Sequence, residues 1–155
     1  MGISARQYQT RLQPILNSQS MEDLVSKIIL SDQKRLKEQK LNEFEQGVRP
    51  DRDKIGHYSN SEMGYDYADF KNKINPLAGF GNVDLLLTRS FYNKMFLIGN
   101  NRQFIFESSD VKTQNLKAKY GLEIMSISQE WFNTRQSDIY RLVLQQQIKD
   151  IYKIA

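Results

Sequence analysis

The residue types that could do chemistry are concentrated in one stretch, residues 47–59, which reads GVRPDRDKIGHYS. It holds two aspartates at alternate positions, Asp51 and Asp53, and the only histidine of the chain, His57. A histidine beside carboxylates could act as a general base, and these three side chains could surround a metal ion as in a nuclease. Carboxylates so close along one turn seldom converge on an ion without distant ligands, and the sequence identifies none. We therefore interpret His57 as a surface residue of a polar turn.

The spacing of the aspartates also matches part of a calcium-binding loop. Asp51 and Asp53 take the places of its first two ligands, and Gly56 and Glu62 those of its glycine and its last ligand. Ile55 stands at the next ligand position, where Asp or Asn is needed, and two cationic side chains flank the ion's place. The pattern therefore predicts no metal site.

Other catalytic chemistries have no matching residues. The chain has no cysteine, which excludes disulfides, thiolate nucleophiles and cysteine-based zinc sites. No serine lies in a G-x-S-x-G turn, and no glycine-rich loop carries the lysine of a phosphate-binding motif. We expect neither an enzyme nor a cofactor. The net charge of +4, with basic and aromatic residues interleaved in RSFYNKMF and FKNK, keeps a basic nucleic-acid-binding accessory protein as the alternative.

The elements that would position these residues are long helices at the two ends of the chain and a small sheet between them. The predicted elements are helices over residues 5–17, 21–46, 65–73, 111–120 and 129–153, a β-hairpin of 91–98 and 102–108, and a short strand or extended run over 122–127. Ser20 and Ser128 are the expected N-caps of the two long helices, and Gly47 follows the first of them as its C′ residue. The order predicts one α+β domain over residues 1–155, with long N-terminal and C-terminal helices packed on a small antiparallel sheet.

The last helix carries an apolar stripe that we expect to face the sheet: Ile139, Leu142, Val143, Ile148, Ile151 and Tyr152. Ile127 and Phe132 have the spacing of a hydrophobic staple across its N-terminus. At least one of Trp131 and Phe132 should be buried against the sheet.

The second half of the first long helix is too polar to be held by its own domain. Over residues 33–46 only a narrow stripe of Leu36, Leu41 and Phe44 is apolar. We expect a neighbouring subunit or another protein of the assembly to cover this stripe, with Lys34, Lys37, Glu38 and Lys40 at the polar rim of the contact. Residues 1–46 would then form a helical arm that makes subunit contacts.

Three segments between residues 40 and 132 resemble a known group of proteins. They are EFEQGVRPDRDKIGHYS, VDLLLTRSFYNKMFL and SSDVKTQNLKAKYGLEIMSISQEWF. The group comprises small virion proteins of tailed phages, closest to those of crAss-like phages of Bacteroides-type hosts. Arg52 and Arg89 stand where its pattern has glycine, and Ile127 stands where it has leucine. The matching residues are Gly47, Ile55, Gly56, Tyr58, Ser59, Val83, Asp84, Leu85, Thr88, Phe91, Tyr120, Gly121, Ile124, Ser128 and Glu130.

The wider class that the chain resembles is the head–tail connector or tail-completion protein. The resemblance implies an α+β protein without an active site that forms a homo-oligomeric ring in the phage neck. Its partners would be further copies of itself, the portal or adjacent neck and tail proteins, and genomic DNA that passes through the ring without specific binding. The expected location is the virion neck or tail, and the host cytoplasm during assembly. We expect no membrane contact, because the longest apolar runs, VDLLL and MFLIG, are far too short to cross a bilayer.

Overall fold

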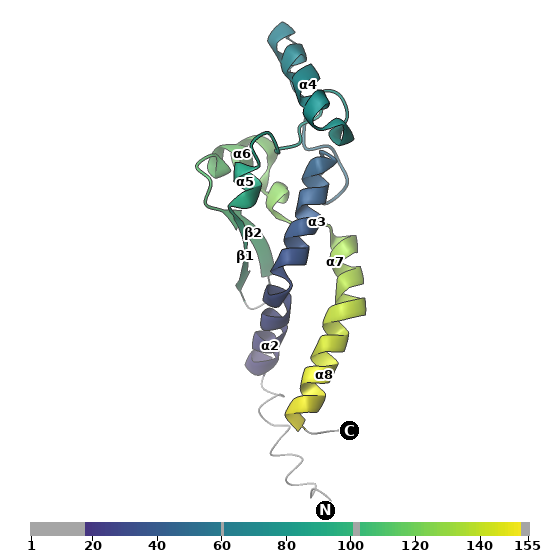
Figure 1. Cartoon of the computed structure of the whole chain (residues 1–155). Helices are drawn as coiled ribbons and strands as arrows, with labels where there is room; N and C mark the ends of the chain where they lie inside the picture. The colour runs from purple at the N-terminus through teal and green to yellow at the C-terminus, as the bar shows by residue number, and fades with distance from the viewer. Residues whose placement is uncertain (1–17, 60, 101–102, 153–155) are drawn as a thin grey trace, which may run out of the picture.

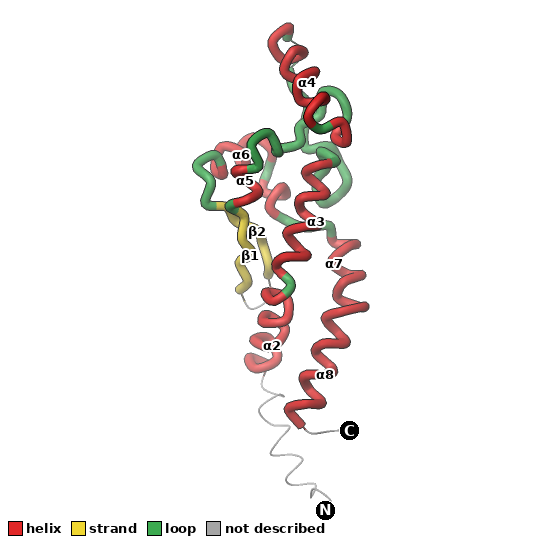
Figure 2. Tube along the Cα trace, viewed as in Figure 1, coloured by secondary structure: helices red, strands yellow, loops and turns green. Residues whose placement is uncertain are grey.

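Helices make up most of the structure, and a two-stranded sheet lies among them (Figures 1 and 2). The computed structural model describes residues 18–59, 61–100 and 103–152. This arrangement confirms the predicted α+β class, although several of the helices are short. The elements are α2 (Ser18–Ser31), α3 (Gln33–Glu45), α4 (Glu62–Ile74), η1 (Pro76–Ala78), α5 (Ser90–Asn93), β1 (Met95–Asn100), β2 (Gln103–Ser108), α6 (Thr113–Tyr120), η2 (Leu122–Met125), α7 (Gln129–Arg135), η3 (Gln136–Tyr140) and α8 (Arg141–Tyr152).

The first long helix is interrupted at Asp32, where the sequence predicted a continuous helix. α2 ends at Ser31 and α3 begins at Gln33, so Asp32 is the one residue between them that is not α-helical. Its carboxylate accepts hydrogen bonds from Arg135 Nε at 2.5 Å and from Tyr140 Oη at 2.7 Å. The interruption therefore coincides with the point at which the C-terminal helix is tied to the N-terminal one. The helix predicted over residues 5–17 lies outside the described residues.

The end of α3 is as the sequence predicted. Gly47 adopts a φ of +63°, in the left-handed region that favours glycine. The Gly47 N–H donates to Phe44 O and the Val48 N–H donates to Glu43 O, both at 3.0 Å. This is a Schellman motif, and it turns the chain sharply away from the helix axis.

The predicted hairpin is present, but its first strand begins later than expected. β1 pairs with β2 in antiparallel register, with Ile98 opposite Ile105. Residues 91–93 belong instead to the short helix α5. Phe91 is buried there, and its ring centroid lies 6.0 Å from that of Phe44 on α3. The helical turn of α5 thus places the Phe91 side chain against α3.

The strand predicted over residues 122–127 is wrong. Its first four residues form the 3₁₀ helix η2, in which Ile124 and Met125 are both buried. Neighbouring residues of a strand point to opposite faces of a sheet, so a strand could not bury both of these side chains in the same core.

The C-terminal helix begins as predicted and then changes register. The Ser128 hydroxyl accepts from the Trp131 N–H at 3.4 Å and caps α7. The π-helical turn η3 adds a residue to the helix and rotates everything that follows. Tyr140, the last residue of this turn, is buried, and the predicted inward stripe is wrong at four positions that are exposed: Ile139, Leu142, Val143 and Ile151.

The start of the same helix is less deeply buried than predicted. Trp131 and Phe132 are both only half-buried, and both pack against the edge of the core together with Ile127. The Phe132 ring centroid lies 5.9 Å from that of Tyr140, about two turns further along the helix.

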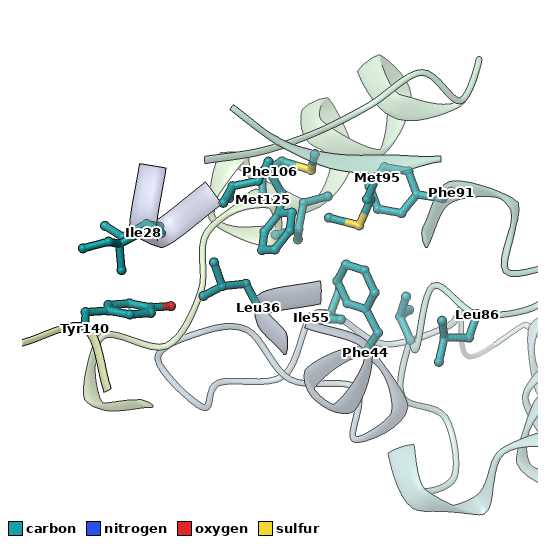
Figure 3. Packing of buried hydrophobic residues seen from close by; sticks show 14 residues of the cluster. Ile28, Leu36, Phe44, Ile55, Leu86, Phe91, Met95, Phe106, Met125 and Tyr140 are labelled. Atoms are coloured by element: carbon teal, nitrogen blue, oxygen red, sulfur yellow. The ribbon is translucent and has the colours of Figure 1, made fainter. Parts of the chain in front are cut away.

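One hydrophobic core holds these elements together. It lies between α3, the inner face of the hairpin and the two loops that follow α3 and α4 (Figure 3). Met95 and Leu97 of β1 point into it, as strand alternation requires, and Phe106 faces them from β2. The central residues from the other elements are Leu36, Phe44, Ile55, Val83, Leu86, Phe91, Ile124 and Met125.

Candidate subunit interface

The loop after α3 does not gather its charged residues into a site. Asp51, Asp53 and His57 are all exposed, and His57 makes a backbone bridge with Asn82. The Asp51 carboxylate accepts from the Asp53 N–H at 3.0 Å, which fixes the turn at Arg52 between them. Within the described residues, no group of three His, Asp or Glu side chains could hold a metal ion.

Two other cations of this loop have structural contacts. Lys54 Nζ donates to the carbonyls of Gln46, at 3.2 Å, and Ala78, at 3.1 Å. It thereby neutralises the negative end of α3 and ties the loop to η1. A guanidinium nitrogen of Arg49 donates to Ile55 O at 3.3 Å across the base of the loop.

The interface predicted on α3 is wrong, because its apolar residues are covered by the chain itself. Leu36 is 2% exposed and Phe44 0%, and both point into the core beneath the hairpin (Figure 3). Leu41 packs against the same core. Lys37 donates to Asn93 O at 3.0 Å and lies over the Tyr92 ring, so it also serves the fold of the monomer. Residues 33–46 are a central helix rather than an arm.

Sequence reasoning missed the reason why so polar a helix can be central. Lys40 and Glu43 are both buried, and Lys40 Nζ lies 2.8 Å from Glu43 Oε2. The other oxygen of Glu43 accepts from the Ser128 N–H at 3.1 Å, at the start of α7. Burial lowers the pKa of Lys40, and the neighbouring Glu43 carboxylate partly offsets that effect. The helical spacing of Leu36, Lys40 and Phe44 was the signal, since it places all three on one face.

The helix that is exposed is α4, which projects from the end of the body (Figure 1). Its N-cap is Ser61, whose hydroxyl accepts from the Gly64 N–H at 3.2 Å. Large apolar side chains along it are open to solvent, and Met63 is 84% exposed. Four of them recur at the three- and four-residue spacing of a single helix face. We define the α4 stripe as these four residues together with Leu77 beyond the helix end: Met63, Tyr67, Phe70, Ile74 and Leu77.

The α4 stripe is continuous with a hollow at the base of the helix. Ile74 and Leu77 line this hollow, which has a volume of about 320 Å³, together with the half-exposed Leu87. Nearer the tip, the rings of Tyr67 and Phe70 lie 6.2 Å apart. An apolar surface of this extent on a projecting helix is typical of a protein–protein contact.

A buried polar cluster fastens α4 to the body. Lys71 Nζ lies 2.5 Å from Asp84 Oδ1, and both side chains are buried. The Asn75 amide donates to Asp84 Oδ2 at 3.0 Å and to Glu45 O, at the end of α3, at 2.9 Å. Because Asp84 also accepts from the Leu86 N–H, the carboxylate joins α4, the following loop and α3. The helix therefore projects in a fixed direction.

A tyrosine pair closes the other side of this cluster. The Tyr58 and Tyr67 rings meet edge to face with centroids 4.9 Å apart. Burial raises the pKa of Tyr58, and the charge of Asp84 adds to the effect, so the phenol stays neutral at physiological pH. The contact supports the base of the α4 stripe from the body side.

A second exposed apolar surface lies on the outer face of the hairpin. Phe96, Ile98 and Ile105 are each exposed by 40% or more. The register places Ile98 directly opposite Ile105, and Phe96 opposite Glu107, so all of these side chains share one face. Antiparallel sheets usually carry polar residues on a face that water covers.

Comparison with protein-family models, with curated proteins and with solved structures finds no match for this chain. None of the helices in the described part of the chain has the length and apolar character needed to cross a membrane. The geometry of the two apolar surfaces is therefore the observation on which a functional proposal can rest.

Proposed function

We propose that this chain is a structural virion protein that assembles into a homo-oligomeric ring in the head–tail connector of a tailed phage. The observation that carries the proposal is the α4 stripe, a continuous apolar face on a helix that is anchored so as to project from the body. A lone helix face of this kind gains most when another molecule covers it. The proposed role includes no catalytic step.

The segments that resemble connector proteins support the proposal by meeting in space. Ile55, Val83 and Ile124, one from each segment, are buried in the same core. A side-chain carbon added at Gly56 would lie 3.3 Å from the Tyr120 ring, which explains why glycine suits that position. Matching residues from all three segments thus contribute to one core.

The two departures from the glycine pattern also have a structural counterpart. Arg52 and Arg89 adopt φ values of +74° and +54°, the region in which glycine is favoured. In each case the preceding side chain supports the turn: Asp51 accepts from the Asp53 N–H, and Thr88 accepts from the Ser90 N–H at 3.4 Å. A pattern with glycine at these positions fits this backbone.

A ring also accounts for the partners that we propose. Copies of the chain would contact each other sideways, while the two ends of the ring would face the portal and the next neck or tail protein. Genomic DNA would pass through the centre without specific binding, and the protein would reside in the virion neck after assembly in the host cytoplasm.

The proposal is tested by the mass of the purified protein in solution, measured by light scattering, together with electron microscopy of the particles. We expect a defined oligomer with a central opening. Phe70→Asp should abolish it, whereas the matched control Leu122→Asp, which alters an apolar side chain that is exposed outside the α4 stripe, should not. A monomer at all concentrations would contradict the proposal. If that monomer bound DNA in a salt-dependent manner, the basic nucleic-acid-binding alternative would replace it.

A further inference from the structure

Within the described residues, no layer covers the outer face of the hairpin. Its inner face packs on α3, while Phe96, Ile98 and Ile105 leave the middle of the outer face apolar and exposed. A two-stranded sheet is marginally stable alone and gains from cover on its apolar face. The usual cover for a small antiparallel sheet is a helix with an apolar stripe.

The same chain carries such a helix, but it cannot reach its own hairpin. The α4 stripe has the spacing of a helix face that packs on a sheet or on another helix. The Lys71–Asp84 pair and the Asn75 hydrogen bonds hold α4 so that it points away from the hairpin (Figure 1). One molecule therefore has both halves of a helix-on-sheet layer, and its described part covers neither of them.

In the described part of the chain, the unpaired charges of α4 and those of the helix that follows the hairpin are opposite in sign. On α4, Lys73 pairs with Asp69 at 2.7 Å, while Glu62 and Asp66 form no ion pair within the described residues. The helix that follows the hairpin, α6, is basic. Its Lys117 pairs with Glu107 of β2 at 2.7 Å and so ties α6 to the hairpin.

The remaining lysines of α6 and of the turn before it supply the excess positive charge. Lys112 and Lys119 are exposed and form no ion pair in the part of the chain that the structure describes. An acidic helix that lies across the hairpin could approach them without repulsion. A basic helix could not, which is why electrostatic complementarity restricts the choice of partner.

We propose that the α4 stripe of one copy docks on the outer hairpin face of the next copy, with the acidic residues of α4 toward α6, the basic helix that Lys117 ties to that face. This inference rests on the ring proposed above and names the contact that builds it. Because two different surfaces meet, the contact is heterologous and repeats head to tail. Such contacts close into a ring when the rotation between neighbours allows it.

The absence of cysteine from the whole sequence makes a direct test clean. Met63→Cys places a thiol on the α4 stripe, and Ile105→Cys places one on the outer hairpin face. The two single variants are purified, mixed and treated with a short bis-maleimide cross-linker. We expect the mixture to give a cross-linked dimer at least about tenfold above either variant alone, with a product that mass spectrometry maps to positions 63 and 105.

Each other outcome of this experiment overturns the inference. Cross-linking of Met63→Cys to itself would mean that two α4 helices face each other. Cross-linking of Met63→Cys to the matched control Leu142→Cys, an exposed apolar position on α8, would move the acceptor surface to the C-terminal helix. A wild-type oligomer without any 63–105 product would refute this contact and leave the ring proposal standing, whereas a wild-type monomer would refute both.

A charge exchange tests the same contact without cysteines. Asp66→Lys should weaken association about three- to tenfold, and the double variant Asp66→Lys/Lys119→Glu should recover most of that loss. Both positions are exposed, so the melting temperature of the dilute monomer serves as the folding control. Association that is unchanged by Asp66→Lys, or a loss that the second substitution does not recover, would overturn the proposed orientation of the charges.

Discussion

Helices α3 and α4 have the same length, 13 residues each, but α3 is central and α4 is exposed. α3 is the more polar of the two, yet it runs through the centre of the molecule and buries Lys40 and Glu43 completely. α4 carries Met63 and Phe70 on an open face. The average polarity of a helix therefore does not decide whether it is central. What decides is whether the residues on each face find partners in the rest of the chain.

The partners of the two helices explain the difference. On α3, Lys40 and Glu43 neutralise each other, and the Ser128 N–H donates a hydrogen bond to the second carboxylate oxygen of Glu43. The polar groups are satisfied, so the apolar residues beside them can be buried without leaving an uncompensated charge. On α4, one polar cluster around Asp84 fixes the base, and no element of the described chain covers the α4 stripe.

The sharpest way to break this comparison is to place the same charge on both helices. Leu36→Asp should lower the free energy of unfolding by more than about 4 kcal/mol, because it buries a carboxylate without a partner. Phe70→Asp should change it by less than about 0.5 kcal/mol, because the side chain is already half exposed in the monomer. Urea denaturation of dilute protein measures both. Similar losses in the two variants would mean that α4 is as much a part of the core as α3.

A smaller loss of stability is expected when one member of the buried Lys40–Glu43 pair is replaced. Lys40→Met should cost about 3–5 kcal/mol, because Glu43 keeps its charge in the core and loses its counter-ion. Lys40→Met/Glu43→Gln should recover much of this cost, since the amide oxygen can still accept from the Ser128 N–H. A double-mutant cycle with Glu43→Gln gives the coupling energy. Additive effects of the two substitutions would show that the pair is not coupled.

The sequence predicted what depends on neighbours along the chain. The presence of the hairpin, the Ser128 cap and the Gly47 helix end all follow from local rules of spacing and turn chemistry. The sequence did not predict features set by distant partners. The first helix is interrupted at Asp32, whose carboxylate binds Arg135 and Tyr140 about a hundred residues away, and no local pattern predicts that contact.

The candidate interface was misplaced for the same reason. The sequence favoured Leu36 and Phe44 as interface residues because the helix around them is polar, and the buried Lys40–Glu43 pair was not recognised. The α4 stripe was visible as spaced apolar residues. Apolar residues at helical spacing usually indicate a core-facing side, and only the structure reveals that nothing in the described chain covers them.

The link at Asp32 gives a prediction of intermediate size that concerns pH. Burial of Asp32 raises its pKa, but the hydrogen bonds from Arg135 and Tyr140 outweigh this, and the net effect is a pKa below the usual value of 3.8. A carboxyl with a lowered pKa in the folded state stabilises fully above its unfolded pKa. That stability is lost as pH falls below 3.8 toward the folded pKa.

Asp32→Asn removes this contribution. The variant should be less stable than the wild type by about 2 kcal/mol at pH 7, because the asparagine cannot form charged hydrogen bonds with Arg135. The difference between the two proteins should shrink as the pH is lowered below 3.8, because Asp32 is then increasingly protonated, first in the unfolded chain and, below its folded pKa, in the folded protein. Urea denaturation at pH 7 and at pH 3 measures the difference. If the difference in the free energy of unfolding between the two proteins were the same at both pH values, Asp32 would not act through its charge.

The smallest predicted effect lies in the loop that joins α3 to α4. Arg52 holds a φ of +74°, a conformation that costs a side-chain-bearing residue about 1–2 kcal/mol and costs glycine nothing. Glycine also loses more entropy on folding, by about 0.5–1 kcal/mol. Arg52→Gly should therefore raise the free energy of unfolding by about 0.5 kcal/mol.

The neighbouring Asp53 is exposed and has no positive φ, so Asp53→Gly should lower the free energy of unfolding by about 0.5–1 kcal/mol. The opposite signs at adjacent positions separate backbone conformation from the loss of a charge. If both variants are destabilised equally, Arg52 is held by its side chain, and the loop between the buried and the exposed helix has a role beyond that of a polar turn.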